Sequence, residues 1–307
     1  MFDIAAIIIN YNSSDYTINC INSIIEKSKK NLNYQIIVID NASEKEDFLK
    51  LSEKIKSISF SNLQLVRSKI NTGFGGGNMH GVQFSNAKYY AFINNDSIFI
   101  NDCLGIIYNH MENNNEYGIC GPMCYKEDGK LLPTLDHFAS PIKELFGRSI
   151  LEKINSEKYP NRKKEYTKPQ QGQFVSGSFM MVRSKDFNSV GGFDTNIFLY
   201  YEETDVCKRL QKINKFAYLI PDAKFIHYHG ASTPKSIAIK TELKISLLYI
   251  IRKHYGYLWH KFFLLFLSIR YFFSSLFKSK YWPLFFVLIK GAHLSSSLKQ
   301  KQKIWEL

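Results

Sequence analysis

Short apolar runs alternate with amphipathic stretches through the first hundred residues. The apolar runs are rich in Ile, Val and aromatic residues, which is typical of strands buried on both faces. We predict these strands over Ile4–Ile9, Gln35–Asp40, Leu63–Arg67 and Tyr89–Ile93. The spacing between them predicts helices over Tyr16–Lys27, Glu46–Lys56 and Gly77–Ser85, and we expect Asp15 to cap the first. This alternation predicts an α/β fold with a mostly parallel sheet flanked by helices.

The pattern weakens in the middle of the chain and then returns. Residues 126–172 are polar and lysine-rich and contain four prolines, so we expect a variable surface excursion there. Beyond it, Phe174–Arg183 predicts a strand and Glu202–Ile213 a helix with an acidic first turn. Two short strands are expected over Ala217–Ile220 and Phe225–His227.

Composition divides the chain into a near-neutral body and a basic tail. Of 307 residues, 45% are hydrophobic and 22% charged, values that exclude a disordered chain, collagen and a disulfide miniprotein. The net charge is +13, and residues 235–307 contribute 13 Lys/Arg against two acidic residues, or +11. We therefore divide the chain into a body over 1–234 and a tail over 235–307.

Aromatic and basic residues are interleaved in the tail. Its longest apolar run, Phe262–Phe277, contains Arg270, and Trp282–Ile289 is shorter still; a membrane-spanning helix needs about 20 apolar residues. Helices of this composition lie in membrane interfaces, so we expect an anionic membrane surface to bind residues 240–300. Packing on the body or on a second copy is an alternative. Nucleic-acid binding is a weaker one because the runs are so apolar, and we expect no nucleic-acid partner.

The cysteines and the N-terminus indicate the compartment. The five cysteines form no Cys-x-x-Cys pair, and Cys120 and Cys124 flank a short apolar run as expected for buried thiols. A reducing cytoplasm fits this usage. The N-terminus has an acidic residue, Asp3, before a short apolar run, so we expect no signal peptide.

Polar residues follow each predicted strand of the first half. The carboxyl ends of parallel strands meet at one edge of a sheet, where ligands bind, so Asn10–Asn12, Asp40–Ser43 and Asn94–Asp96 should converge. Asp96 could hold a divalent cation against a phosphate, or its segment could be an ordinary turn. The glycines of Gly73–Gly77 permit close approach of a bulky ligand, or form a flexible loop. They are no dinucleotide fingerprint, because that motif follows the first strand, and a nicotinamide dehydrogenase is a distant alternative.

Two groups in the second half could carry chemistry. Glu202, Glu203 and Asp205 follow an aromatic stretch; crowded carboxylates near apolar rings have raised pKa values, as a general base requires, although acids are also favoured in any first helical turn. His227 and His229 would point the same way from a strand. Either histidine could be a metal ligand or a structural residue.

Together these segments resemble glycosyltransferase family 2, a large inverting family with the GT-A fold, and within it bacterial rhamnosyltransferases and related cell-surface polysaccharide enzymes. They appear in the family's order. The matching stretches are IIINYNSSDYTINCINSI, IIVIDNAS, NTGFGGGNMHG, FINNDS, FVSGSFMMVR, VGGFDTNIFLYYEETDVCKRL and IHYHGAST.

The resemblance implies a donor site in residues 1–125. The donor nucleotide would be bound by Asn10, Tyr11, Asn12, Asp40, Asn41, Arg67, Asn71, Gly73, Gly77 and Asn95. Asp96 and His227 would hold Mg²⁺ or Mn²⁺, with Asn94 replacing the first carboxylate of the family's Asp-x-Asp motif. Met79 stands where relatives often have Asn.

The resemblance places catalysis and acceptor binding in residues 173–234. Glu203 matches the catalytic base, with Glu202 as the alternative, and Asp205 and Arg209 would support their helix. The acceptor side would include Gly177, Ser178 and Tyr201.

The activity implied is a single displacement that inverts the sugar. The donor would be a nucleotide-diphosphate sugar, with dTDP-L-rhamnose preferred and UDP-linked galactose, N-acetylhexosamine or galactofuranose as alternatives. The acceptor would be a saccharide linked to polyprenyl diphosphate, in the synthesis of O-antigen, capsule or wall polysaccharide. The expected location is the bacterial cytoplasm, on the inner face of the cytoplasmic membrane. A non-catalytic basic membrane-binding scaffold is the alternative of another class.

Overall fold

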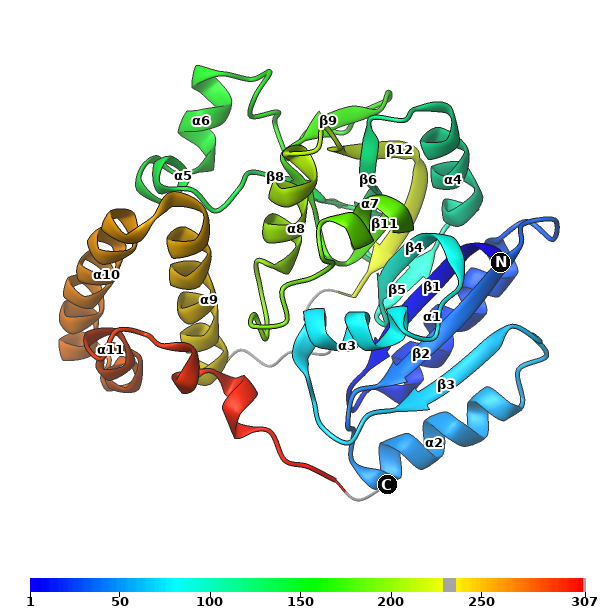
Figure 1. Cartoon of the computed structure of the whole chain (residues 1–307), viewed down its shortest axis with the longest axis horizontal. Coiled ribbons are helices and arrows are strands. Elements are labelled where there is room, and N and C mark those ends of the chain that lie inside the picture. The colour runs from blue at the N-terminus through cyan, green and yellow to red at the C-terminus, as the bar shows by residue number, and fades with distance from the viewer. Residues whose placement is uncertain (229–235, 306–307) are drawn as a thin grey trace.

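A central twisted sheet carries the body of the protein (Figure 1). The computed structural model describes residues 1–228 and 236–305, and within them ten strands form this sheet. The order along its main path is β3-β2-β1-β4-β11-β6-β12-β5, with β7 paired to β6 and β9 to β12. The strands are β1 Phe2–Asn10, β2 Tyr34–Asp40, β3 Leu63–Arg67, β4 Ala87–Asn94, β5 Ser97–Phe99, β6 Tyr117–Tyr125, β7 Leu131–Leu132, β9 Gln170–Gly172, β11 Phe179–Arg183 and β12 Phe216–His227. A separate pair joins β8 Leu135–Asp136 to β10 Phe174–Val175.

The sheet is mostly parallel, as predicted. β1 to β4 are parallel neighbours, as are β6 and β12, whereas β11 runs antiparallel between β4 and β6. This is the α/β architecture expected from the sequence, with polar residues at the carboxyl ends of β1, β2 and β4.

Helices cover both faces of the sheet. α1, α2 and α4 pack on one face, and α3, α7 and α8 on the other, each over its own apolar cluster. The helices of the body are α1 Ser14–Lys27, α2 Lys45–Lys56, α3 Gly73–Val82, α4 Cys103–Asn113, α5 Pro141–Phe146, α6 Arg148–Ile154, α7 Ser184–Ser189 and α8 Glu202–Gln211. The five cysteines are free and buried, as predicted for Cys120 and Cys124.

Two local predictions in the first half are wrong. The glycine run is not a loop before a helix over Gly77–Ser85, because α3 begins at Gly73. The Phe74 amide donates to the Phe198 carbonyl at 3.0 Å, a tertiary contact that holds this first turn. Asp15 does not cap α1 but lies in its first turn, where its carboxylate pairs with Lys50 and Lys54 of α2.

The second half also departs from the prediction. The strand expected over Phe174–Arg183 is split into β10 and β11 by Ser176–Ser178, and the two strands expected after α8 are one, β12, with a register shift between Ile220 and Lys224. Residues 126–172 contain β7, β8, β9, α5 and α6. Asp136 anchors this segment through ion pairs with Arg148 and Arg162 at 2.6 and 3.0 Å.

The tail forms helices beside the body (Figure 1). α9 Ile237–Tyr255 lies between the body and α10 Tyr257–Phe277. α11 Trp282–Ile289 packs on α9 and α10. Short 3₁₀ turns cover Ser279–Tyr281, Leu294–Ser296 and Leu298–Lys301. The chain then returns to the N-terminal half, where the Trp305 amide donates to the Lys69 carbonyl at 2.8 Å. None of the described helices is long and apolar enough to cross a membrane.

Candidate active site

A hydrogen-bond network joins the ends of β1 and β2. The Asn10 amide donates to Asp40 Oδ1 at 3.0 Å and to Ser43 Oγ at 3.1 Å, and its oxygen accepts from the Thr17 hydroxyl at 2.8 Å. Asn95, after β4, donates to the same hydroxyl at 2.8 Å. The predicted convergence of strand ends is therefore confirmed.

Asp40 is fully buried at the centre of this network. Burial raises the pKa of its carboxyl, while hydrogen bonds from Ser43 and Asn10 and the charge of Arg67 oppose the rise. Arg67 Nε lies 3.6 Å from Asp40 Oδ2, and its guanidinium stacks over the Phe48 ring. A cation and a buried acid thus sit side by side at the sheet edge, where a nucleotide could meet both.

Asn41 connects β2 to the glycine helix. Its amide donates to Asn71 Oδ1 at 3.0 Å and to the Gly73 carbonyl at 3.1 Å. A Cβ at Gly77 would lie 2.9 Å from Ile9 Cδ1 and 3.2 Å from Asn41 Nδ2, so only glycine lets α3 approach this closely.

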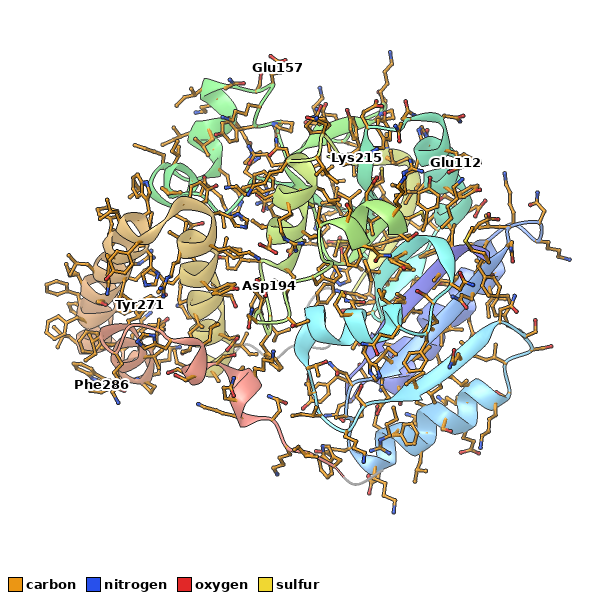
Figure 2. The ribbon with its side chains drawn as sticks, viewed as in Figure 1. Glu112, Glu157, Asp194, Lys215, Tyr271 and Phe286 are labelled. Carbon is orange, nitrogen blue, oxygen red and sulfur yellow. The ribbon has the colours of Figure 1, made fainter. Side chains whose placement is uncertain are left out.

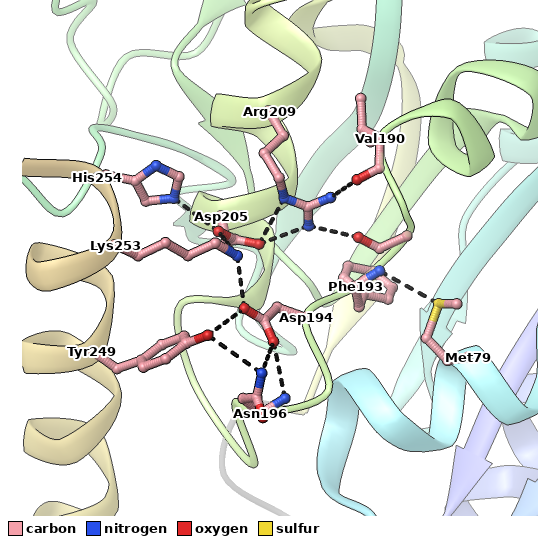
Figure 3. A network of polar contacts seen from close by, with 11 residues as sticks. Met79, Val190, Phe193, Asp194, Asn196, Asp205, Arg209, Tyr249, Lys253 and His254 are labelled. Carbon is pink, nitrogen blue, oxygen red and sulfur yellow. Dashed lines mark hydrogen bonds and ion pairs between the residues drawn. The ribbon is translucent and has the colours of Figure 1, made fainter. Parts of the chain in front are cut away.

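Three other residues of the predicted donor region are placed differently from one another. Tyr11 is 41% exposed beyond β1, and Asn12 next to it adopts a left-handed backbone with φ 51°. Asn12 Oδ1 accepts from the Glu44 amide at 2.8 Å, which links the loops after β1 and β2. Met79 packs into the core, where its sulfur accepts from the Phe193 amide at 3.4 Å (Figure 3).

Asp96 and His227 meet where β12 pairs with β5. Ser97 is the register partner of His227, so the preceding Asp96 lies against the histidine ring. His227 Nε2 is 2.9 Å from Asp96 Oδ1, and the side-chain nitrogen of Asn94, Nδ2, is 3.4 Å from the same ring nitrogen. Both Asp96 and His227 are buried. The fold thus brings together the two predicted metal ligands from positions 131 residues apart in the chain (227 − 96).

The pair fits a small divalent cation. Among the described residues no hydrogen bond satisfies Asp96 Oδ1, although the ring nitrogen is so close. Adjacent ligands on an octahedral ion with bonds of about 2.0–2.1 Å lie about 2.9 Å apart. No group of three or more His, Cys, Asp or Glu in residues 1–228 and 236–305 could hold a metal, so other ligands would come from water or substrate. His229 lies outside the described residues.

Two of the predicted acceptor residues, Gly177 and Ser178, adjoin the end of β4, whereas Tyr201 precedes α8 and packs against the apolar cluster of the tail. The backbone N–H of Asn94 donates to the Ser178 carbonyl at 2.9 Å. A Cβ at Gly177 would lie 3.2 Å from the Phe74 ring of α3. The Asp96 turn, the segment between β10 and β11, and the glycine helix are therefore packed in contact.

Two glutamates begin α8 after a strained approach. Tyr200 and Tyr201 both have left-handed backbones, with φ of 72° and 73°, a conformation that is uncommon outside glycine and that gathers at functional sites. A Cβ at Gly75 would lie 3.4 Å from Glu202 Cγ, and one at Gly73 only 2.0 Å from the Phe198 oxygen. The glycine helix thus abuts the segment that presents Glu202 and Glu203.

The two glutamates differ in their surroundings. Glu202 is buried, and burial together with the charge of Glu203 raises its pKa well above the usual value. Its Oε1 has no hydrogen-bond partner among the described residues. Glu203 is partly exposed, and burial raises its pKa to about 7. Both shifts disfavour the ionised carboxylate, and with a pKa of about 7 Glu203 can still accept a proton at neutral pH.

Asp205 joins α8 to the tail (Figure 3). Its Oδ2 accepts from Arg209 Nε at 2.9 Å and Nη2 at 2.6 Å, and its Oδ1 lies 2.8 Å from His254 Nε2 and 2.7 Å from Lys253 Nζ. These partners hold the pKa of the Asp205 carboxyl well below its usual range, although burial opposes the shift. Asp205 and Arg209 are paired on α8, as predicted, and Lys253 and His254 of α9 are further partners of Asp205.

Sequence reasoning missed the partners that come from distant segments. His254 and Lys253 reach Asp205 from the tail, and Lys253 also contacts Asp194 at 2.7 Å. Thr17 bridges Asn10 and Asn95. The three carboxylates in the first turn of α8 indicate that cationic partners are needed. The sequence does not show which Lys, Arg or His residues these partners are.

The chain is similar in sequence to known glycosyltransferases. The family model described as glycosyl transferase family 2 matches residues 5–191. The rhamnosyltransferase WbbL of Escherichia coli is 29% identical over 261 residues, which cover 80% of this chain and 92% of the relative. An N-acetylglucosaminyl-diphospho-decaprenol L-rhamnosyltransferase of Mycobacterium tuberculosis is 27% identical over 46% of this chain and 47% of its own.

Solved structures show the same fold at low identity. A crystal structure of GalNAc-T7 with UDP, GalNAc and Mn²⁺ superposes with a TM-score of 0.60 at 13% identity. The match covers 82% of this chain and 48% of that one, so this chain spans about half the length of that structure.

Proposed function

The chain belongs to glycosyl transferase family 2 and is a glycosyltransferase with the GT-A fold, and from this premise we propose that it transfers L-rhamnose from dTDP-L-rhamnose to a lipid-linked saccharide. The similarity to rhamnosyltransferases along most of the chain supports the sugar. The family match favours this enzyme over a non-catalytic scaffold. The observation that carries the proposal is the placement of Asp96 against His227 and of Glu203 at the start of a helix packed on the glycine helix.

The donor nucleotide binds at the carboxyl ends of β1 to β4. Asp40 and Arg67 face the nucleoside, and Asn41 and Asn71 hold the glycine helix against it. Asp96 and His227 would hold a divalent cation, Mg²⁺ or Mn²⁺, which would offset the negative charge that develops on the leaving diphosphate.

Glu203 removes the proton from the attacking hydroxyl of the acceptor. A pKa of about 7 suits a general base at neutral pH, because the group is substantially ionised and still basic. Burial disfavours the ionised form of the neighbouring Glu202, which limits the negative charge beside the base. The attack displaces the nucleotide in one step and inverts the anomeric carbon. Gly177, Ser178 and Tyr201 border the side from which the acceptor enters.

The acceptor we propose is a saccharide on polyprenyl diphosphate, and the tail holds the enzyme at the inner face of the bacterial cytoplasmic membrane. The relative from Mycobacterium tuberculosis carries a decaprenyl diphosphate acceptor in its name. The exposed apolar and basic side chains of α10 support contact with lipid.

Incubation with a panel of nucleotide sugars tests the function. The panel contains dTDP-L-rhamnose and the UDP-linked galactose, N-acetylhexosamine and galactofuranose, each with Mn²⁺ or with EDTA. We expect thermal stabilisation and metal-dependent hydrolysis with dTDP-L-rhamnose, and transfer with inversion when a lipid-linked saccharide is added. Absence of binding, hydrolysis and transfer with every donor would refute an active enzyme, and preference for a UDP-sugar would refute the donor.

A further inference from the structure

A cationic cavity lies in the tail, away from the donor site. It has a volume of about 310 Å³ and lies between the start of α9 and the end of α10. Its lining is basic and aromatic: Lys240, Arg270, Tyr271, Ser274, Phe277, Lys278 and Tyr281. Lys240 Nζ donates to the Tyr281 hydroxyl at 3.3 Å and lies 4.4 Å from the centre of the same ring.

The cations of this cavity have no acidic counterpart in the described part of the tail. Residues 236–305 contain one carboxylate, that of Glu242. It is occupied elsewhere, because its oxygens accept from the Ser297 hydroxyl and the Leu298 amide, each at 2.7 Å. Three positive side chains and two tyrosines therefore surround a space suited to an anion with several oxygen atoms.

An apolar surface adjoins the cavity. Side chains at helical spacing along one face of α10 are between 51% and 83% exposed: Leu258, Leu265, Ile269, Phe273 and Leu276. Phe277 is 86% exposed and also lines the cavity, so it joins the two surfaces. Figure 2 shows aromatic side chains along α10 and α11, with Tyr271 and Phe286 labelled. The opposite face of α10 is buried against the tail core, so this exposed stripe is additional apolar surface.

We propose that the cavity binds the phosphate or diphosphate head group of a lipid whose hydrocarbon chain lies on the exposed face of α10. The charge of the cavity and the apolar stripe beside it match the two parts of such a molecule. A free nucleotide or inorganic phosphate would use only the cavity and leave the stripe uncovered.

Two further lysines interact electrostatically with residues of the cavity or with Glu203. Lys244 lies one turn after Lys240 on α9; burial lowers its pKa, and Arg270, Lys240 and Lys143 lower it further against the opposing charge of Glu144. Lys143 of α5 also acts on Glu203, whose pKa it lowers against the effect of burial. Lys143 is itself buried and pairs with Glu144 at 3.5 Å.

The proposed function assigns this head group to the lipid-linked acceptor, and the extension rests on that function. The anion site itself stands on the geometry of the cavity alone.

Vesicle binding by the full chain tests the site. We compare the double variant K240Q/R270Q with K29Q/K30Q, which removes the same charge from exposed positions after α1, outside the tail. The vesicles are phosphatidylcholine containing a little polyprenyl diphosphate, or phosphatidylglycerol at equal charge. Each basic residue at an anionic lipid contributes about five-fold in affinity, so the cavity variant should bind about 25-fold more weakly than wild type, and the control within a few-fold.

Loss confined to polyprenyl diphosphate assigns the cavity to the acceptor, and equal loss on both vesicles assigns it to anionic lipids in general. Inorganic diphosphate should compete with the vesicles for the cavity of the wild-type protein. The site is overturned if the cavity variant binds like the control variant, or if diphosphate does not compete. Circular dichroism confirms folding of each variant. Donor binding, hydrolysis and transfer by the wild-type protein are measured separately, so failure of all three would reject the enzymatic proposal and leave the lipid result standing.

Discussion

Replacing the proposed base by its amide, Glu203→Gln, tests the reaction most directly. The substitution keeps the size of the side chain and removes only its ability to accept a proton. General-base assistance contributes about 10²–10⁴-fold, which corresponds to about 3–5 kcal/mol of barrier at about 1.4 kcal/mol per ten-fold. Turnover should therefore fall by that factor, while donor affinity measured by calorimetry stays within a few-fold of wild type.

The pH profile gives an independent signature of the same group. Because Glu203 has a pKa of about 7, the wild-type kcat/KM should rise with pH and level off above neutrality. Two pH units below that pKa, about one molecule in a hundred carries the ionised base, so kcat/KM should be about 100-fold below its plateau. The Glu203→Gln variant should lack this limb. The assay is initial-rate transfer from radiolabelled donor between pH 5 and 9, at saturating metal.

Two further variants make the result specific. Glu202→Gln should retain far more activity than Glu203→Gln, because burial and the charge of Glu203 raise the pKa of Glu202 and so disfavour its ionised form. Glu53→Gln, at an exposed position of α2, controls for loss of one carboxylate. The reasoning is refuted if Glu203→Gln turns over within ten-fold of wild type, or if the low-pH limb survives in it.

Asp96→Asn should abolish the metal dependence of donor binding, seen as loss of the Mn²⁺-induced rise in melting temperature with donor, and a rise equal to that of wild type would contradict the metal assignment. Asp205→Asn leaves Arg209, Lys253 and His254 without their buried anion, so urea unfolding should show a loss of about 3–5 kcal/mol. The benefit of Asp205 requires its ionised form, and its pKa is lowered, so this difference should be full above the ordinary aspartate pKa and shrink as pH falls below it; an equal difference at pH 7 and pH 2 would contradict that account. Gly73→Ala places a methyl group 2.0 Å from the Phe198 oxygen at φ +75°, so it should cost more than about 1 kcal/mol and weaken donor binding in calorimetry, whereas an unchanged stability would show that this contact is readily relieved.

The buried strands were predictable because their residues leave little choice. Ile4–Ile9 and the strand ending at Asp40 are apolar on both faces, so only the interior of a parallel sheet accommodates them. Their polar ends then have to meet, and the Asn10–Asp40 hydrogen bond confirms it. The acid–histidine pair also followed from the resemblance, but its proximity depends on β12 pairing with β5, which no local pattern indicates.

The errors arose where tertiary contacts outweigh local preference. Glycine is a poor helix former, so nothing in the sequence predicts that α3 starts at Gly73; the contact of its first turn with Phe198 and the close approach at Gly77 account for it. Residues 126–172 are polar enough to suggest a surface excursion. They nevertheless include Asp136 and Lys143, whose charges act on Glu203.

The boundary drawn from charge at residue 234 does not separate two independent structures. α9 carries Lys240 of the cavity in its first turn, and Lys253 and His254, the partners of Asp205, in its last. The same helix therefore supports the helix that presents Glu203. Because α9 is one continuous helix, a lipid bound at the cavity would be held at a fixed position relative to α8, the helix that carries Glu203. Deleting the tail would remove both the lipid contact and the support of α8, so only substitutions within the cavity or on the exposed stripe can separate membrane binding from catalysis.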